Sequence, residues 1–327
     1  MAPAAPRIAV PLALDPRALA GLDPKARVTD LSGETMGTYW RVRLAAAPEQ
    51  DLSAIRPAIV ARLDAIVAEM SHWAPDSLLS RFNRASGGSW TALPADFATV
   101  MVAGFAIAEA SDAAFDPAIG RVTDAYGLGP NPSTRVPDAA TLASARAVSG
   151  YHRLAFDAVT RRMRQPGGLW LDLSGIAKGH GADAVADLLA RLGVRHALVE
   201  IGGECVGRGL RPDNDPWWVD LDTPPGLTLP PLRVALHQIA VATSGNYVRG
   251  DHTIDPRNGL PVRNGIVSVS VLHKSAMMAD AWASALTVLG PAQGAVLAER
   301  EGLAARLITV RGGVAEEWLS PALMLML

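Results

Sequence analysis

Residues 172–183 read DLSGIAKGHGAD. The stretch predicts the end of a strand, a tight turn at Gly175 and the first turn of a helix. The helix is expected to continue because apolar residues recur after it with helical spacing, at Ala184, Val185, Leu188, Leu189 and Leu192. Amide N–H groups at the start of such a helix attract phosphate and other anions.

Lys178 is the unusual residue of this stretch. Lysine occurs only at positions 25, 178 and 274, although Lys and Arg together number 30. Because the chain uses Arg almost everywhere else, we expect a compact ammonium group to be required here. Lys178, Asp172 and His180 therefore form a first candidate cluster. The alternative is an ordinary lysine that extends to solvent from a helix start.

Length and composition limit the remaining interpretations. A chain of 327 residues forms two domains or one large one, and 49% apolar residues supply a sizeable core. A net charge of −2 without basic runs argues against a nucleic-acid surface. The single cysteine, Cys205, excludes an intrachain disulfide and a cysteine-based zinc cluster, and we expect it to be a small buried residue. No run of about 18 apolar residues predicts a membrane span.

The N-terminal segment is rich in Ala and Pro. We expect a loosely ordered arm over residues 1–27, followed by a single domain over residues 28–327. Pro6, Pro11 and Asp15 interrupt any apolar stretch that could serve as a signal peptide, and no early cysteine is available for lipidation. The sequence as written therefore predicts a cytoplasmic protein.

Periodicity predicts an α/β (mixed α+β) fold, a single large unit with central mixed sheets flanked by helices. Helices are expected over 51–70, from Pro94 to 108, over 276–289 and from Pro291. Strands are expected over 34–45, 170–173, 196–200, 217–221, 232–242, 266–272 and 307–310, with a hairpin over 151–164.

Three further segments could contribute chemistry. Gly202-Gly203-Glu204 is a flexible turn with one carboxylate, and His252 follows residues 242–247 and precedes Asp255-Pro256 in a loop, where it could act as a general base. Asp280 and Ser284 are spaced i, i+4, so both oxygens project from one helix face and could bind Mg²⁺. The alternative is an acidic residue near a helix start beside an unrelated Ser.

Residues 179–184 and Glu200 also allow a second interpretation, a site that binds a dinucleotide. Gly179, Gly181 and Ala184 fit G-x-G-x-x-A, and Glu200 follows at the end of the next predicted strand. Residues 174–178 argue against it, because they separate the predicted strand from the first glycine. No phosphate-binding loop of the G-x-x-x-x-G-K-S/T type occurs.

Taken in order along the chain, these segments resemble the ApbE family, the Mg-dependent FAD:protein FMN transferases. The resemblance extends from Met36 to about Ser320. Any one of its segments is weak evidence, but eight in the family's order are specific. They are residues 36–39, 76–83, 115–120, 172–179, 201–204, 242–245, 252–256 and 279–286.

The resemblance implies site residues by position. FAD-binding residues would be Met36, Trp73, Ala114, Phe115, Asp116, Lys178, Glu204, His252, Ile254 and Asp255. The carbonyl of Gly175 with Asp280 and Ser284 would hold Mg²⁺. The catalytic residues would be His252, as acceptor of the target hydroxyl proton, and Asp280. Three positions depart from the family pattern, which usually has Thr at Ser284, Asp at Glu204 and a bulky aliphatic residue at Thr253.

The implied reaction is transfer of FMN from FAD to a Ser or Thr hydroxyl of a redox flavoprotein, with release of AMP. The alternatives are an FAD pyrophosphatase that yields FMN and AMP, and a non-catalytic FAD-binding protein. The N-terminal sequence predicts a cytoplasmic protein, whereas the resemblance implies the periplasmic face of a bacterial inner membrane.

Overall fold

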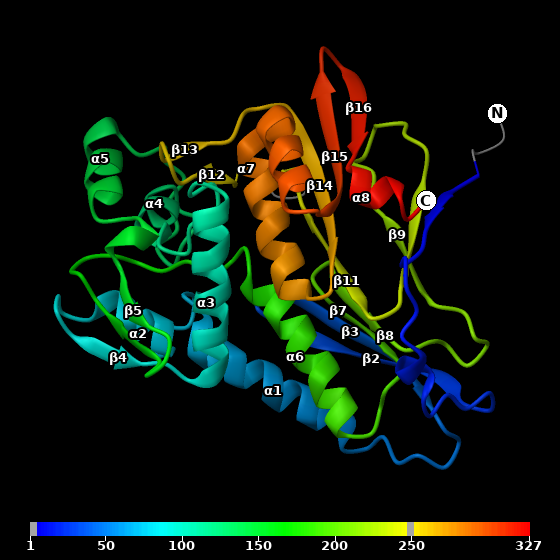
Figure 1. Cartoon of the computed structure of the whole chain (residues 1–327). Coiled ribbons are helices and arrows are strands. Elements are labelled where there is room, and N and C mark those ends of the chain that lie inside the picture. Colours follow the sequence, from blue (N-terminus) through cyan, green and yellow to red (C-terminus); the bar gives the residue numbers. More distant parts are fainter. Residues whose placement is uncertain (1–4, 247–251) are drawn as a thin grey trace. The chain divides into compact units, whose positions relative to one another are not determined.

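The computed structural model describes residues 5–246 and 252–327 (Figure 1). Its backbone contacts divide the chain into two compact units. Unit 1 comprises residues 1–63, 178–248 and 264–327, and unit 2 comprises residues 64–177 and 249–263. Each unit is described separately below.

An eight-stranded sheet with the order β16-β15-β14-β11-β8-β7-β3-β2 forms the centre of unit 1, and every neighbouring pair in it is antiparallel. Its strands are β2 (Arg27–Thr35), β3 (Thr38–Ala46), β7 (Ala197–Ile201), β8 (Glu204–Arg208), β11 (Ile239–Ser244), β14 (Ile266–His273), β15 (Ala304–Arg311) and β16 (Val314–Leu319). A second sheet has the order β1-β10-β9, with β1 (Arg7–Ala9), β10 (Leu232–Leu236) and β9 (Trp217–Leu221).

Helices and the small sheet cover opposite faces of the large sheet in unit 1. On one face, residues of α6 (Ala177–Arg191) and of the first half of α1 (Ile55–Met70) pack against alternate residues of β3, including Trp40, Val42 and Leu44. On the other face, Val241 and Leu272 pack with residues of the small sheet and of α8 (Pro321–Met324). Unit 1 also contains the short 3-10 helix η1 (Pro16–Leu19).

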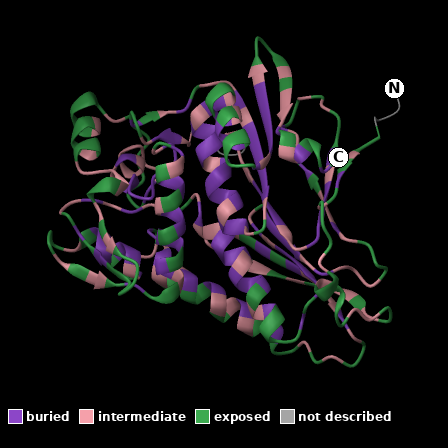
Figure 2. Ribbon diagram, viewed as in Figure 1, coloured by how far each residue is buried: buried purple, intermediate pink, exposed green. Residues whose placement is uncertain are grey.

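Helix α7 (Ala276–Arg300) also belongs to unit 1, and most residues of its first half are buried (Figure 2). Gly290 has a φ of 79°, and this kink coincides with the predicted boundary between residues 289 and 291. Among the described helices, α7 alone is long and apolar enough to cross a membrane, but 61% of its most apolar window is buried inside the protein. The core helix of a globular protein can be equally long and equally apolar.

Unit 2 contains shorter elements. Its helices are α2 (Leu78–Arg84), α3 (Ala95–Ala110), α4 (Gly120–Ala125), α5 (Ala139–Ala147), η2 (Tyr151–Arg153) and the second half of α1. Its strands form two small antiparallel sheets. They are β4 (Trp90–Ala92), β5 (Ala155–Asp157), β6 (Arg162–Arg164), β12 (Ile254–Asp255) and β13 (Leu260–Pro261). The hairpin predicted over residues 151–164 is present as β5–β6.

The mixed α+β class is confirmed, but three predicted strands need correction. The strand from Glu34 is broken at Met36 and Gly37, whose φ values of 49° and 70° make the tight turn between β2 and β3. The single strand over residues 232–242 is two strands, because Gln238 has a φ of 58° in a turn that lacks Gly or Pro.

Residues 170–173 are not a strand. Asn83 takes the place of a neighbouring strand, since its side chain accepts from the Leu171 amide at 2.8 Å and donates to the Leu171 carbonyl at 3.1 Å. The dinucleotide-binding interpretation also fails, because residues 165–176 directly before α6 form no strand and β7 is antiparallel to both of its neighbours.

Candidate active site

A lysine and two buried carboxylates meet in unit 1. Lys178 lies in the first turn of α6, Glu204 opens β8, and Asp280 lies in the second turn of α7. The Lys178 Nζ donates to Glu204 Oε1 at 2.5 Å, and the Gly179 amide donates to Asp280 Oδ2 at 3.1 Å. Glu204 is 2% exposed and Asp280 is 6% exposed.

With both of its carboxyl groups ionised, this cluster would carry more negative charge than its lysine balances. Burial and the neighbouring Asp280 charge raise the pKa of Glu204 to about 8, against the lowering effect of the Lys178 ammonium. Burial also raises the pKa of Asp280, against Lys178 and the Gly179 N–H. The Glu204 Oε2 atom is buried and has no hydrogen-bond partner among the residues that the structure describes. Two buried carboxylates beside one ammonium group favour binding of a proton or of a further cation.

Tight backbone geometry places these groups. Gly202 and Gly203, with φ values of 58° and 106°, form the turn that delivers Glu204 into β8. Met36 turns its side chain toward α6, since its Cε atom would lie 3.2 Å from a Cβ added at Gly181. Unit 1 thus brings Met36 to the helix that carries Lys178.

Ser284 follows Asp280 by one turn of α7 and is half-buried. The expected i, i+4 placement on one helix is therefore present, whereas metal binding by the pair stays a prediction. Within the described residues no group of three or more His, Cys, Asp and Glu side chains could hold a metal ion. A cation at Asp280 would then depend on few protein oxygens.

In unit 2, residues 114–116 lie in the connection between α3 and α4. Ala114 and Phe115 are buried. Asp116 accepts hydrogen bonds from the Ala118 amide at 2.7 Å and the Tyr151 amide at 3.0 Å. Burial raises the pKa of Asp116, and these two amides oppose the shift. The carboxylate therefore shapes its turn and holds the start of η2.

Trp73 presents a free aromatic surface in the same unit. Its residue is 59% exposed, and its ring centroid lies 5.0 Å from that of His72. An exposed indole backed by a second ring can stack on a planar ligand.

The predicted histidine loop is described from His252 onward, and Tyr247 of the preceding segment lies outside the described residues. His252 is half-buried. Ile254 packs in a cluster with Ile119, and the Asp255 carboxylate accepts from the Arg257 guanidinium at 2.9 and 2.8 Å. Asp255 therefore stabilises its own loop.

The predicted site residues are divided between the two units. Unit 1 holds Met36, Lys178, Glu204, Asp280 and Ser284. Unit 2 holds Trp73, Ala114, Phe115, Asp116, Gly175, His252, Ile254 and Asp255. Gly175 lies in the turn directly before α6.

The expected grouping of Asp172 with Lys178 and His180 needs correction. Lys178 is engaged by Glu204, while the Asp172 side chain accepts from Ser174 and Thr123 and lies 3.4 Å from the His72 Nδ1 atom. Burial raises the pKa of Asp172, but the His72 charge and these hydrogen bonds outweigh it, so the net shift is downward. No local pattern indicates this His72 contact, because Asp172 lies far from His72 in the sequence.

Asp183 is a second residue whose role the sequence did not reveal. It lies in α6, and its carboxylate accepts hydrogen bonds from the amides of Ala276 and Met277 at 2.9 and 3.0 Å. A cap supplied by another helix leaves no local sequence signal, because capping patterns are read within a few residues of the helix start.

Comparison with known proteins agrees with this architecture. The sequence profile of the ApbE family matches residues 36–307. The FAD:protein FMN transferase of Klebsiella pneumoniae is 32% identical over 311 residues, which cover 91% of this chain and 89% of that protein. The FAD:protein FMN transferase of Vibrio cholerae is 34% identical over 293 residues, with coverage of 86% and 87%.

Solved structures give the same relationship. The flavin transferase ApbE from Vibrio cholerae superposes with a TM-score of 0.87 at 32% identity, covering 92% of this chain and all of that chain. The apo flavinyl transferase ApbE from Pseudomonas stutzeri gives a TM-score of 0.86 at 32% identity, with coverage of 92% and 97%.

Proposed function

Because the chain belongs to the ApbE family, we propose that it is an FAD:protein FMN transferase that moves FMN from FAD to a Ser or Thr hydroxyl of a target protein. The observation that carries the proposal is the cluster of Lys178 with the buried Glu204 and Asp280, built into a fold whose relatives carry that name. A diphosphate substrate brings negative charge, so its site requires cations positioned in advance.

The donor atoms of this cluster suit Mg²⁺. Asp280 supplies a carboxylate, Ser284 supplies a hydroxyl one turn later, and both are oxygen ligands of the kind that Mg²⁺ prefers. The raised pKa values of Glu204 and Asp280 show that two ionised carboxylates beside one lysine are unfavourable, and a bound cation would relieve this in place of a proton. When bound there, Mg²⁺ would neutralise phosphate charge in the transition state.

The protein's own groups would then perform three tasks. Lys178 holds Glu204 and provides positive charge near the diphosphate. Trp73 stacks on the flavin ring. His252 accepts the proton of the target hydroxyl, whose oxygen forms a bond to the FMN phosphorus while the bond from that phosphorus to AMP breaks.

The test combines the purified protein with FAD, Mg²⁺ and a candidate redox flavoprotein, and measures the intact mass of that acceptor. A mass increase of one FMN group that disappears with EDTA supports the proposal. Absence of any adduct although FAD binds would contradict it. A control with Asp280→Asn should bind FAD and form no adduct, because the metal carboxylate is lost.

A further inference from the structure

The first turns of α6 and α7 meet in unit 1 (Figure 1). Asp183 of α6 serves the start of α7: it accepts from the Ser275 hydroxyl at 2.6 Å and from the amides of Ala276 and Met277 at 2.9 and 3.0 Å. Amide groups at a helix start have no partner within their own helix, so this carboxylate caps α7.

The reverse contact is also present. Asp280 of α7 accepts from the Gly179 amide in the first turn of α6 at 3.1 Å. Each helix start is therefore capped by an aspartate of the other helix. The backbones touch at this point, because a Cβ at Gly179 would lie 2.2 Å from the Ala276 carbonyl oxygen.

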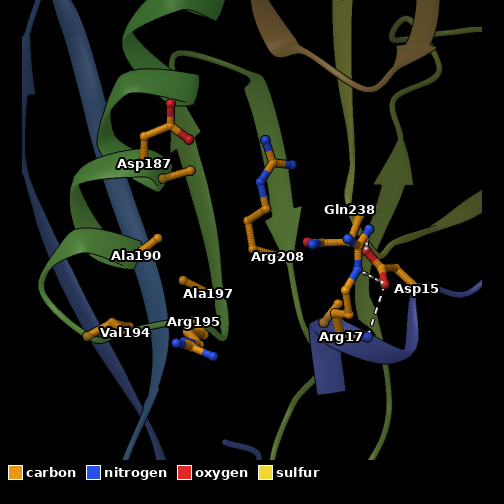
Figure 3. Close-up of a pocket in the computed structure, with 11 residues that line it drawn as sticks. Asp15, Arg17, Asp187, Ala190, Val194, Arg195, Ala197, Arg208 and Gln238 are labelled. Atoms are coloured by element: carbon orange, nitrogen blue, oxygen red, sulfur yellow. Dashed lines mark hydrogen bonds and ion pairs between the residues drawn. The ribbon is translucent and has the colours of Figure 1, made fainter. Parts of the chain in front are cut away.

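Asp183 also forms a long ion pair with an arginine. The nearest arginine is Arg208, whose Nη2 lies 3.9 Å from Asp183 Oδ1. Arg208 reaches it from a pocket of about 240 Å³ that Asp187 and Ala190 also line (Figure 3). A separation of 3.9 Å is too long for a hydrogen bond, so the helix start provides the main stabilisation of this carboxylate.

We propose that Asp183 is a positioning residue for the reaction centre: by capping α7 it fixes the Asp280 carboxylate against the first turn of α6 and sets its distance from Lys178. Gly179 and Asp183 are spaced i, i+4, so they face α7 from one side of α6. Loss of Asp183 leaves the start of α7 with only the Ser275 cap on the Met278 amide, and the Gly179–Asp280 hydrogen bond lengthens or breaks. The catalytic consequence rests on the proposed function, whereas the structural coupling does not.

Amide hydrogen exchange tests the coupling in the metal-free protein. In Asp183→Ala, the Gly179 amide should exchange at least about tenfold faster than in the wild type, while amides at the centre of β3 keep their rates. The matched control is Asp138→Ala, which removes the cap that Asp138 gives to Thr141 in α5 and should leave Gly179 unchanged. If Asp183→Ala does not fold, Asp183→Asn should show a smaller change in the same direction.

An unchanged Gly179 rate, or an equal acceleration of every amide in unit 1, would overturn the proposal. A kinetic measurement adds the functional part: kcat should fall at least about tenfold while KM for FAD stays within about threefold of wild type. Equal loss in Asp138→Ala would contradict a positioning role. If the wild-type protein transfers no FMN, the proposed function fails, and the exchange rates still decide the role of Asp183.

Discussion

Replacement of Gly179 by Ala should separate the helices that carry Lys178 and Asp280. The added Cβ would lie 2.2 Å from the oxygen and 2.5 Å from the carbon of the Ala276 carbonyl. Both are backbone atoms, so α6 and α7 must move apart by about 1 Å to reach an ordinary contact.

The magnitude follows from three effects. Forcing an extra methyl group into a packed contact costs about 1–3 kcal/mol. Weakening the hydrogen bond from Gly179 to the Asp280 carboxylate costs about 1–3 kcal/mol. The better helix propensity of Ala returns about 1 kcal/mol. We therefore expect the free energy of unfolding to fall by about 1–5 kcal/mol and FMN transfer to fall by at least about tenfold.

Gly181→Ala is the matched control, two residues along the same helix. Its Cβ would meet Ile201 Cδ1 at 3.0 Å and Met36 Cε at 3.2 Å, which are the mobile ends of flexible side chains. The free energy of unfolding should change by less than about 1 kcal/mol. Urea unfolding followed by circular dichroism measures both variants. Equal stability of Gly179→Ala and Gly181→Ala would refute the reasoning.

Three further outcomes are expected. Folded Glu204 keeps its proton up to about pH 8, whereas the carboxyl group of the unfolded chain loses its proton near the ordinary pKa of 4.5. Between these pH values the folded state binds more protons than the unfolded state. The free energy of unfolding of the metal-free protein should therefore fall as pH rises from about 4.5 to about 8. Glu204→Gln should flatten this dependence in urea unfolding, and a wild-type stability that rises with pH would contradict it. Lys178→Met should retain the circular dichroism spectrum of the wild type, but its rate of FMN transfer should fall at least about a hundredfold, because two buried carboxylates lose their ammonium partner. The control is Lys274→Met at an exposed position, which should match the wild type. Chelation of divalent cations should abolish FMN transfer and leave the circular dichroism spectrum unchanged, and activity that persists in EDTA would remove Mg²⁺ from the mechanism.

Local patterns predicted the long helices of this chain and part of its strands, whereas the short helices α2, α4, α5 and α8 were not predicted. The i, i+3, i+4 spacing located α1 and α6, which pack an apolar face in the core with β3, and the apolar run over residues 266–272 located β14, whose residues are mostly buried. The turn at Met36 and Gly37 was missed because Met rarely has a positive φ. The apolar segment at Leu171 resembles a strand in sequence. It is not a strand, because its hydrogen bonds go to the Asn83 side chain, which is distant in sequence.

The candidate site was predictable only in part. Lys178 was recognisable by composition, and Asp280 with Ser284 by spacing. The contact of Lys178 with Glu204 and the caps exchanged by Asp183 and Asp280 depend on how α6, α7 and β8 pack. Such contacts join residues that are 26 or more positions apart, so no local pattern encodes them.

The most direct test of the proposed transferase is the ratio of AMP released to FMN attached when the protein acts on FAD and Mg²⁺ with and without an acceptor. We predict one AMP for each FMN-modified acceptor and negligible AMP without it, because His252 is proposed to activate a protein hydroxyl and not water. Rapid AMP release without acceptor, or AMP in large excess over the adduct, would contradict the account and identify a hydrolase.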